Sequence, residues 1–245
     1  PGSVVAIGAS SRPNSVGEAV TRNLLTAGFQ GDVYLVNKKG GTIEGRTVFR
    51  KVSELPAVPD LAVIMTPAET IPGLIVALGE LGTRVAVVIS AGPGDGADAR
   101  AVNARWRKRL LRAAKPYLMR IVGPNCIGFA APRVGLNASF GPSGLKAGRI
   151  AAVAQSGAVL AGLADWGVAQ GIGFSHLISM GDMADVDFGD VLDMLSREYD
   201  TRAVLMYVEG ITQARKFMSA ARSVARVKPV IVLKGGRHAS AAAAT

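Results

Sequence analysis

The chain has 245 residues, of which 49% are apolar, and its 28 Lys and Arg against 18 Asp and Glu give a formal net charge of +10. This composition excludes a disordered chain and supplies a buried core, in one large domain or, as we expect, two modest ones. The longest stretch without a charged residue, Trp166 to Gly181, is broken by glycines. It is too short for a membrane-spanning helix, which needs about 20 apolar residues.

The cysteine content predicts the compartment of the protein, and the two ends of the sequence predict that it continues beyond them. Cys126 is the single cysteine, which excludes a disulfide framework within the chain, and no signal peptide is present. We therefore expect a cytoplasmic protein. Strand-like sequence follows Pro1 almost at once and the chain stops beside the alanine run 241–244, so we expect it to be part of a longer protein.

The first half of the chain alternates short β-branched runs with longer helical patterns. The expected strands are 4–7, 33–36, 61–64, 85–89 and 120–122, and the expected helices are 18–27, 69–81 and 99–114. Apolar strands separated by helices indicate a parallel sheet that is buried on both faces. We therefore expect a doubly wound α/β domain over residues 1–130.

A second α/β pattern follows a segment rich in Pro, Gly, Asn and Ser. That segment, 131–148, is the expected linker between two domains. Beyond it the expected strands are 150–153, 174–178, 203–208 and 230–233, and the expected helices are 158–169, 188–197 and 213–225. Residues 149–245 are therefore predicted to form a second, smaller α/β domain.

The positive charge raises the question of nucleic-acid binding. The densest basic cluster lies on one predicted helix and consists of Arg105, Arg107, Lys108, Arg109 and Arg112. Its members point to different sides of a helix of 3.6 residues per turn, which is typical of a solvated outer face. We expect no nucleic-acid partner, and note that a positive protein also attracts small polyanions.

The loop after the first strand is suited to phosphate groups. Ligands of open parallel sheets bind beyond the carboxyl ends of the strands, and this loop, Gly8 to Gly17, leads from such an end into a helix. Glycine lets the backbone approach a ligand, helix N-termini offer free N–H groups, and Ser10, Arg12 and Ser15 can bind phosphate oxygens. A tight turn with polar caps is the alternative interpretation.

An NAD-dependent oxidoreductase is not expected. The pattern Gly-x-Gly-x-x-Gly/Ala occurs at 92–97, after the fourth strand and not after the first. Asn37-Lys38-Lys39 stands where a ribose-binding acidic residue would follow the second strand. Lys39 is either a phosphate ligand or an ordinary loop lysine.

Other strand ends carry small or loop-shaping residues that we expect to line one crevice, although each alone is more often structural. They are Thr66-Pro67, Ser90-Ala91-Gly92 and Gly123-Pro124-Asn125-Cys126. In the second domain, a helix is expected to begin at Ser156-Gly157-Ala158, where the free N–H groups and the helix dipole could bind a phosphoryl group. Ser156 is equally well explained as the N-cap of that helix. Glu209 follows a later strand, as an orienting carboxylate or as a solvated side chain.

Several enzyme classes are excluded by motifs that the sequence lacks. There is no His-Glu-x-x-His zinc motif, no cysteine cluster and no Gly-Lys-Ser/Thr nucleotide loop, so neither a metallohydrolase nor a Walker-type ATPase fits. Of the two histidines, His176 lies in a strand pattern and is interpreted as structural, and His238 follows a Gly-Gly-Arg loop.

Taken in order, these motifs resemble those of a known family. They are the first loop, Asn37-Lys38-Lys39, Ile89-Ser90-Ala91-Gly92, Gly123-Pro124-Asn125-Cys126-Ile127-Gly128, Gln155-Ser156-Gly157, Ala184-Asp185-Val186-Asp187-Phe188, Tyr207-Val208-Glu209-Gly210 and Lys234-Gly235-Gly236-Arg237. The whole chain resembles the CoA-ligase half of the NDP-forming acyl-CoA synthetases, relatives of the succinyl-CoA synthetase α subunit. The resemblance implies a Rossmann-like CoA-binding domain followed by a flavodoxin-like ligase domain.

The resemblance also implies an activity and residue roles. Family members convert acyl-CoA, phosphate and ADP to free acid, CoA and ATP, passing the phosphoryl group through a histidine that Glu209 would orient. Ser156, Gly157 and Ala158 would bind phosphate. The CoA phosphates would be held by Gly8, Ser10, Arg12 and Lys39, and the path of CoA would be lined by Pro67, Ser90, Gly92, Asn125 and Cys126.

The sequence departs from the family pattern at two places. The usual Asn-Pro-Lys is Asn37-Lys38-Lys39, and His238 comes too early and lacks the Thr-Gly that follows the family's phosphorylated histidine. We therefore do not assign His238 as catalytic. The histidine and the ATP-grasp portion, which would hold ADP or ATP with Mg²⁺, are expected downstream or in another subunit, so the fragment alone is expected to be inactive and the protein an oligomer.

A second resemblance keeps an alternative open. Residues 172–176 and 214–222 also resemble bacterial proteins that fuse this module to a GNAT acetyltransferase. In that reading the chain is a regulatory CoA-binding module without chemistry of its own. The intact Glu209 and Ser156-Gly157 favour the ligase.

Overall fold

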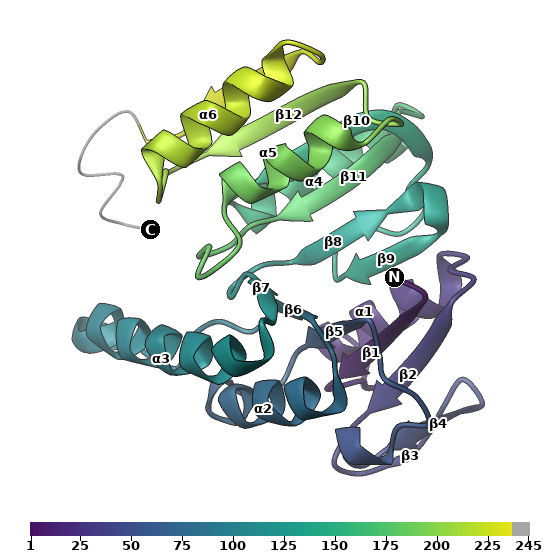
Figure 1. Ribbon diagram of the computed structural model, residues 1–245. Coiled ribbons are helices and arrows are strands. Elements are labelled where there is room, and N and C mark those ends of the chain that lie inside the picture. Colours follow the sequence, from purple (N-terminus) through teal and green to yellow (C-terminus); the bar gives the residue numbers. More distant parts are fainter. Residues whose placement is uncertain (237–245) are drawn as a thin grey trace.

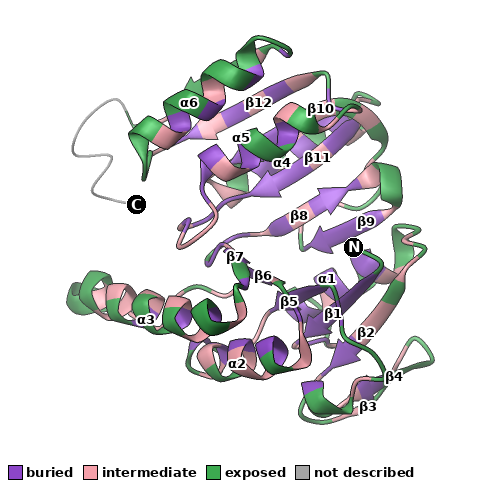
Figure 2. Ribbon diagram, viewed as in Figure 1, coloured by how far each residue is buried: buried purple, intermediate pink, exposed green. Residues whose placement is uncertain are grey.

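The computed structural model describes residues 1–236 and consists of two α/β units, one above the other in Figure 1. Each is built on its own sheet, with helices packed against it. Figure 2 shows that the strands are largely buried and that the helices turn their exposed sides outward. The expected α/β architecture is thereby confirmed. Within these residues no helix is both long enough and apolar enough to cross a membrane.

The first sheet has the strand order β3-β4-β2-β1-β5-β6-β7 and is parallel except for β3. Its strands are β1 (Ser3–Ile7), β2 (Asp32–Val36), β3 (Gly41–Ile43), β4 (Arg46–Phe49), β5 (Leu61–Ile64), β6 (Val85–Val88) and β7 (Arg120–Val122). Its helices are α1 (Val16–Thr26), α2 (Ile71–Leu81) and α3 (Ala99–Ala114). The apolar positions of α2 and α3, such as Ile75 and Leu110, are fully buried against one face of this sheet.

The second sheet has the order β13-β12-β10-β11-β8-β9. Its strands are β8 (Gly128–Ala131), β9 (Leu136–Ser139), β10 (Ala147–Ala154), β11 (Phe174–Ser179), β12 (Ala203–Val208) and β13 (Val230–Lys234). Helix α4 (Gly157–Ala169) packs Leu160 on one face, while α5 (Phe188–Arg197) and α6 (Ala214–Ala225) pack Leu195 and Phe217 on the other.

The expected linker at 131–148 is not a linker, because it contains β9 and the start of β10. β8 and β9 form an antiparallel hairpin that continues the second sheet beyond β11. Leu136 and Ala138 of this hairpin are buried in the core beneath α1, on the other face of the first sheet. Asn137 and Ser139 are buried too, but their side chains hydrogen-bond to each other at 2.6 Å, which removes the cost of burying them. The second unit therefore covers part of the first.

A short strap also joins the two units along the free edge of β7. Three backbone N–H groups of residues 182–186 donate to carbonyl groups of residues 121–124: Val186 to Ile121 at 3.0 Å, Ala184 to Gly123 at 2.9 Å and Asp182 to Pro124 at 2.9 Å. Because these bonds satisfy an otherwise open strand edge, the strap fixes the second unit beside the last strand of the first.

Each sheet has a topological switch point, a strand from which the following strands are added first on one side and then on the other. Ligands of such folds bind beyond the carboxyl ends of the strands at this point. In the first sheet β1 lies between β2 and β5, and in the second β10 lies between β11 and β12. The loops that follow β1, β5, β10 and β12 are therefore the ones that position a site.

Candidate functional site

The loop after β1 requires glycine at its first position. The N–H groups of Gly8 and Ala9 both donate to the carbonyl of Val36, at 2.9 and 3.2 Å, so the loop folds back over the end of β2. Gly8 has φ +97°, and a Cβ there would lie 3.2 Å from the carbonyl of Met65 on β5's extension. Both the conformation and the close approach therefore favour glycine.

The polar side chains of this loop serve two purposes. Ser15 caps α1, since its Oγ accepts from the Glu18 N–H at 3.2 Å and donates to the Arg12 carbonyl at 2.8 Å. Ser10 Oγ accepts from the Arg12 N–H at 3.0 Å. The interpretation as a capped turn is therefore correct for Ser15, while the exposed Arg12 side chain remains available to an anion.

Lys39 lies next to this loop because Asn37 ties the two loops together. Asn37 Nδ2 donates to the Ala9 carbonyl at 2.8 Å, and its Oδ1 accepts from the Lys39 N–H at 3.0 Å. The side chains of Lys38 and Lys39 are exposed. The structure thus brings Gly8, Ser10, Arg12 and Lys39 to one edge of the first sheet.

The remaining strand ends of the first sheet form a hydrogen-bonded row. Ser90 Oγ donates to the Thr66 carbonyl at 2.7 Å, and the Asn125 N–H donates to the Ser90 carbonyl at 3.1 Å. Pro67 is exposed at the start of this row, and Gly92 lies beyond Ser90, in a loop whose Gly94 N–H donates to Asn103 Oδ1 at 2.7 Å.

Cys126 does not face this row. It is 4% exposed, and its thiol donates to the Val88 carbonyl, with an Sγ–O distance of 3.3 Å, inside the core beneath α1. Burial raises the pKa of the Cys126 thiol to about 12. The sequence pattern placed Cys126 in the crevice because it adjoins Asn125, but Asn125 is exposed whereas Cys126 is buried in the core.

The N-terminus of α4 lies against the end of the first unit. Ser156 is the N-cap, with its Oγ 3.4 Å from the Val159 N–H, and Ala158 is exposed. A Cβ at Gly157 would lie 2.5 Å from Cγ2 of Ile127, two residues after Asn125. The chain from Asn125 to Ile127 therefore connects the row of strand ends in the first sheet to the helix N-terminus of the second.

Glu209 follows β12, beside the turn that opens α4. Its N–H and that of Gly210 donate to Gln155 Oε1 at 3.0 and 2.9 Å, and its carbonyl accepts from Lys234 Nζ at 2.8 Å. Sequence reasoning missed the role of Gln155 and of Lys234. Their positions directly after β10 and at the end of β13 were the available signal.

Two families of known domains match the chain. The CoA-binding domain matches residues 2–132, more than half of the chain, and the succinyl-CoA ligase-like flavodoxin domain matches residues 147–245. The chain belongs to the CoA-binding domain family and continues into a succinyl-CoA ligase-like flavodoxin domain.

The chain is similar along nearly its whole length to ADP-forming acetate–CoA ligases. The α subunit of ADP-forming acetate–CoA ligase I from Pyrococcus furiosus is 40% identical over 97% of this chain, which covers 52% of that protein. The ADP-forming acetate–CoA ligase I of Archaeoglobus fulgidus is 38% identical, with 100% of this chain and 35% of the relative covered. The chain thus spans about half or less of the length of these relatives.

A solved structure supports the family fold. The apo acetyl-coenzyme A synthetase 1 of Ca. Korarchaeum cryptofilum superposes with a TM-score of 0.92 at 36% identity, covering 100% of this chain and 54% of that one. The same synthetase was also solved in complex with phosphate and ADP. The Rossmann-like and flavodoxin-like assignments of the two units are thereby confirmed.

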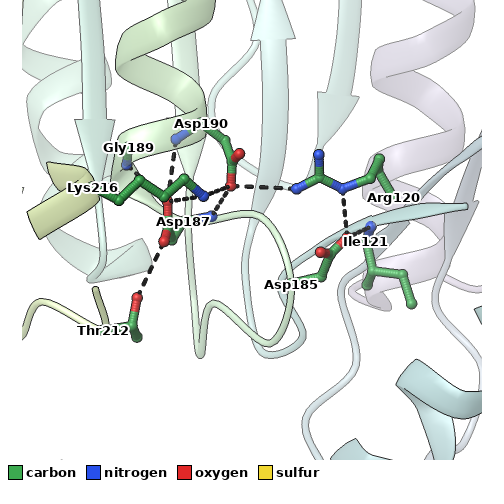
Figure 3. Close-up of polar contacts among 8 residues, drawn as sticks. All are labelled: Arg120, Ile121, Asp185, Asp187, Gly189, Asp190, Thr212 and Lys216. Carbon is green, nitrogen blue, oxygen red and sulfur yellow. Dashed lines mark hydrogen bonds and ion pairs between the residues drawn. The ribbon is translucent and has the colours of Figure 1, made fainter. Parts of the chain in front are cut away.

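An ionic network holds the CoA-binding unit and the flavodoxin-like unit together (Figure 3). Arg120 on β7 donates from Nε to Asp185 Oδ2 at 2.9 Å, and its Nη2 lies 3.3 Å from Asp190 Oδ2. Lys216 of α6 contacts Asp190 Oδ2 at 2.6 Å and the buried N-cap Asp187 at 2.9 Å. The hydrogen bond that Arg120 donates to Asp185 is the main reason that the pKa of Arg120 lies above its ordinary value.

His176, the histidine within residues 1–236, lies on β11 and not in the loops described above. It is partly buried, with a buried Nδ1 that has no hydrogen-bond partner, and burial lowers its pKa. This agrees with a structural role. His238 lies outside the described residues, and within those residues no group of three or more His, Cys, Asp or Glu side chains is placed to hold a metal ion.

Proposed function

We propose that this chain is the acyl-CoA- and phosphate-binding portion of an ADP-forming acyl-CoA synthetase, an acid–thiol ligase. One observation carries the proposal. The strand ends of the CoA-binding unit lead through Asn125 to Ile127, which contacts Gly157 at the N-terminus of α4. A thioester that ends beside Asn125 would therefore meet a phosphate at that helix N-terminus.

The residues at each end of this path supply different parts of the binding. Gly8, Ser10, Arg12 and Lys39 would hold the CoA phosphates, since Arg12 and Lys39 are exposed cations on two loops that the hydrogen bond from Asn37 to Ala9 joins. The path from there would be lined by Pro67, Ser90, Gly92 and Asn125. Cys126 is omitted from this lining because its side chain is buried in the core.

At the other end, the site would bring phosphate and thioester into contact. A phosphate oxygen forms a bond to the thioester carbonyl carbon, the carbon–sulfur bond breaks, and CoA leaves as a thiolate that takes up a proton. The products are acyl phosphate and CoA. Ser156, Gly157 and Ala158 would stabilise the negative charge with the N–H groups and dipole of α4. Glu209 would orient the imidazole that next accepts the phosphoryl group.

The remaining parts of the reaction are proposed to lie in another segment or subunit. These are the phosphorylated histidine and an ATP-grasp portion that holds ADP with Mg²⁺. We further propose that the protein is a cytoplasmic oligomer, in agreement with its one buried, reduced cysteine. The chain by itself is then expected to bind CoA and phosphate without producing ATP.

The test is ATP formation by the full-length natural protein given acyl-CoA, phosphate and ADP, with free CoA measured in the same samples. Acetyl-CoA and longer acyl-CoAs are compared, because the acyl pocket is not defined by these loops. ATP and CoA produced in equal amounts would support the synthetase. CoA binding with no ATP from any thioester would refute it and favour a regulatory CoA-binding module, such as one fused to an acetyltransferase.

A further inference from the structure

Gln155 occupies the point at which β10 and β12 separate. The last ladder contact between the two strands is the bond from the Gln155 N–H to the Tyr207 carbonyl, at 3.1 Å. Beyond it β10 turns into α4, so the backbone of the residues after β12 has no neighbouring strand on that side. The N–H groups of Glu209 and Gly210 need another acceptor.

The side chain of Gln155 supplies that acceptor for both groups. Its Oε1 accepts from Glu209 at 3.0 Å and from Gly210 at 2.9 Å, and all three residues are partly buried. One oxygen with two lone pairs thus fixes two successive peptide groups. From the opposite side Lys234 Nζ donates to the Glu209 carbonyl at 2.8 Å, so the Glu209 backbone is held at both its N–H and its C=O.

The residue type at this position agrees with a neighbouring phosphate site. A glutamate would accept the same two hydrogen bonds, but it would place a negative charge next to Ser156 at the N-terminus of α4. A glutamine accepts both bonds without opposing an anion there. A hydrophobic residue of the same length would leave two partly buried N–H groups unpaired.

We propose that Gln155 is a positioning residue, which fixes the backbone of Glu209 so that its carboxylate faces the group that accepts the phosphoryl. This inference rests on the proposed function. Gln155 then acts on phosphoryl transfer through Glu209 and has no part in binding CoA, because the CoA-binding residues lie on loops of the other sheet.

The test uses the full-length protein with Gln155→Met, which keeps the length of the side chain and removes the acceptor. Gln170→Met, at the exposed C-cap of α4, is the matched control. For Gln155→Met we expect kcat for ATP formation to fall about tenfold to hundredfold, as for other residues that orient a reacting group. KM for acyl-CoA should change little, the melting temperature should fall because two partly buried N–H groups lose their acceptor, and Gln170→Met should behave as wild type.

Hydrogen exchange gives a readout that does not depend on activity. The Glu209 and Gly210 amides should exchange faster in Gln155→Met and unchanged in Gln155→Glu, which keeps an acceptor oxygen. If Gln155→Met does not fold, Gln155→Asn is used instead, because its side chain is one methylene shorter and withdraws the acceptor. It should show the same fall in kcat and the same faster exchange of the Glu209 and Gly210 amides. An active wild type with normal kcat and normal exchange in these variants would overturn the positioning role alone. A wild type that makes no ATP would overturn the proposed function and the catalytic role together.

Discussion

Ile127 and Gly157 are in direct contact: the methyl carbon Cγ2 of Ile127 lies 2.5 Å from where a Cβ of residue 157 would be. Ile127 directly precedes β8, in the segment that leads from the first sheet into the second, and Gly157 is the first residue of α4. The segment that leaves the strand ends of the first sheet is therefore packed against the N-terminus of α4, with no room for a Cβ at position 157.

Gly157→Ala tests this contact. The new methyl group must displace Ile127 or α4, so we expect a destabilisation of about 1 to 3 kcal/mol and lower ligase activity. Gly162→Ala is the control on the same helix, because nothing lies within 4 Å of a Cβ there. It should be neutral or stabilising by up to about 1 kcal/mol. Urea unfolding of both variants decides this, and an equal effect of the two would contradict the contact.

Lys39→Ala and Arg12→Ala are expected to weaken CoA binding, each by about tenfold, because each removes a charge-assisted hydrogen bond to phosphate. Lys38→Ala, at the exposed neighbouring position, is the control and should leave the affinity nearly unchanged. Isothermal titration calorimetry measures all three. If Lys38→Ala weakens binding as much as Lys39→Ala, the loops act only through general positive charge.

The network at Asp190 is expected to make the stability sensitive to acid. Burial opposes its ionisation, but the hydrogen bond and charge of Lys216 outweigh this and hold the pKa of Asp190 below its ordinary 3.8. The stabilisation is therefore complete above that value and is lost as pH falls through the lowered pKa. Lys216→Met should unfold at lower temperature at pH 6 and lose less stability between pH 5 and 3. Parallel melting curves for wild type and variant would contradict this.

Cys126 is expected to be unreactive in the folded protein. Thiolates and not thiols react with alkylating reagents, and a pKa of about 12 leaves almost no thiolate near pH 7. Iodoacetamide should modify it only after unfolding, as mass spectrometry would show. Cys126→Ala should cost about 1 kcal/mol of stability and leave activity intact. Loss of activity in a folded variant would reveal a covalent role for the thiol.

Much of the fold could be predicted because its strands and helices have regular apolar patterns. The bounds of β5, β7, β12, α3 and α5 agree with the expected ones to the residue. The β8–β9 hairpin was missed because Asn137 and Ser139 are typical of loops. Their side chains suit a buried strand because they hydrogen-bond to each other and to the backbone of Pro142 and Gly141.

The candidate site, too, contains residues that could be predicted from the sequence and contacts that could not. The loops at the carboxyl ends of the strands follow from the parallel topology, so the sequence could bring Gly8, Lys39 and Ser156 into consideration. The hydrogen bond from the Glu209 N–H to Gln155 spans 54 positions along the chain, and the bond from Arg120 to Asp185 spans 65. Such pairs depend on how helices and strands pack in three dimensions. Local sequence patterns therefore do not predict them.

The most direct measurement is the incorporation of radiolabelled phosphate into the full-length protein in the presence of acyl-CoA and the absence of ADP. We expect labelled protein to form only with a thioester present, with one CoA released for each phosphoryl group bound, and the label to be lost in Glu209→Gln while CoA affinity is retained. Labelling that does not depend on acyl-CoA, or CoA release without any label, would contradict the proposal that this chain couples thioester cleavage to phosphoryl transfer.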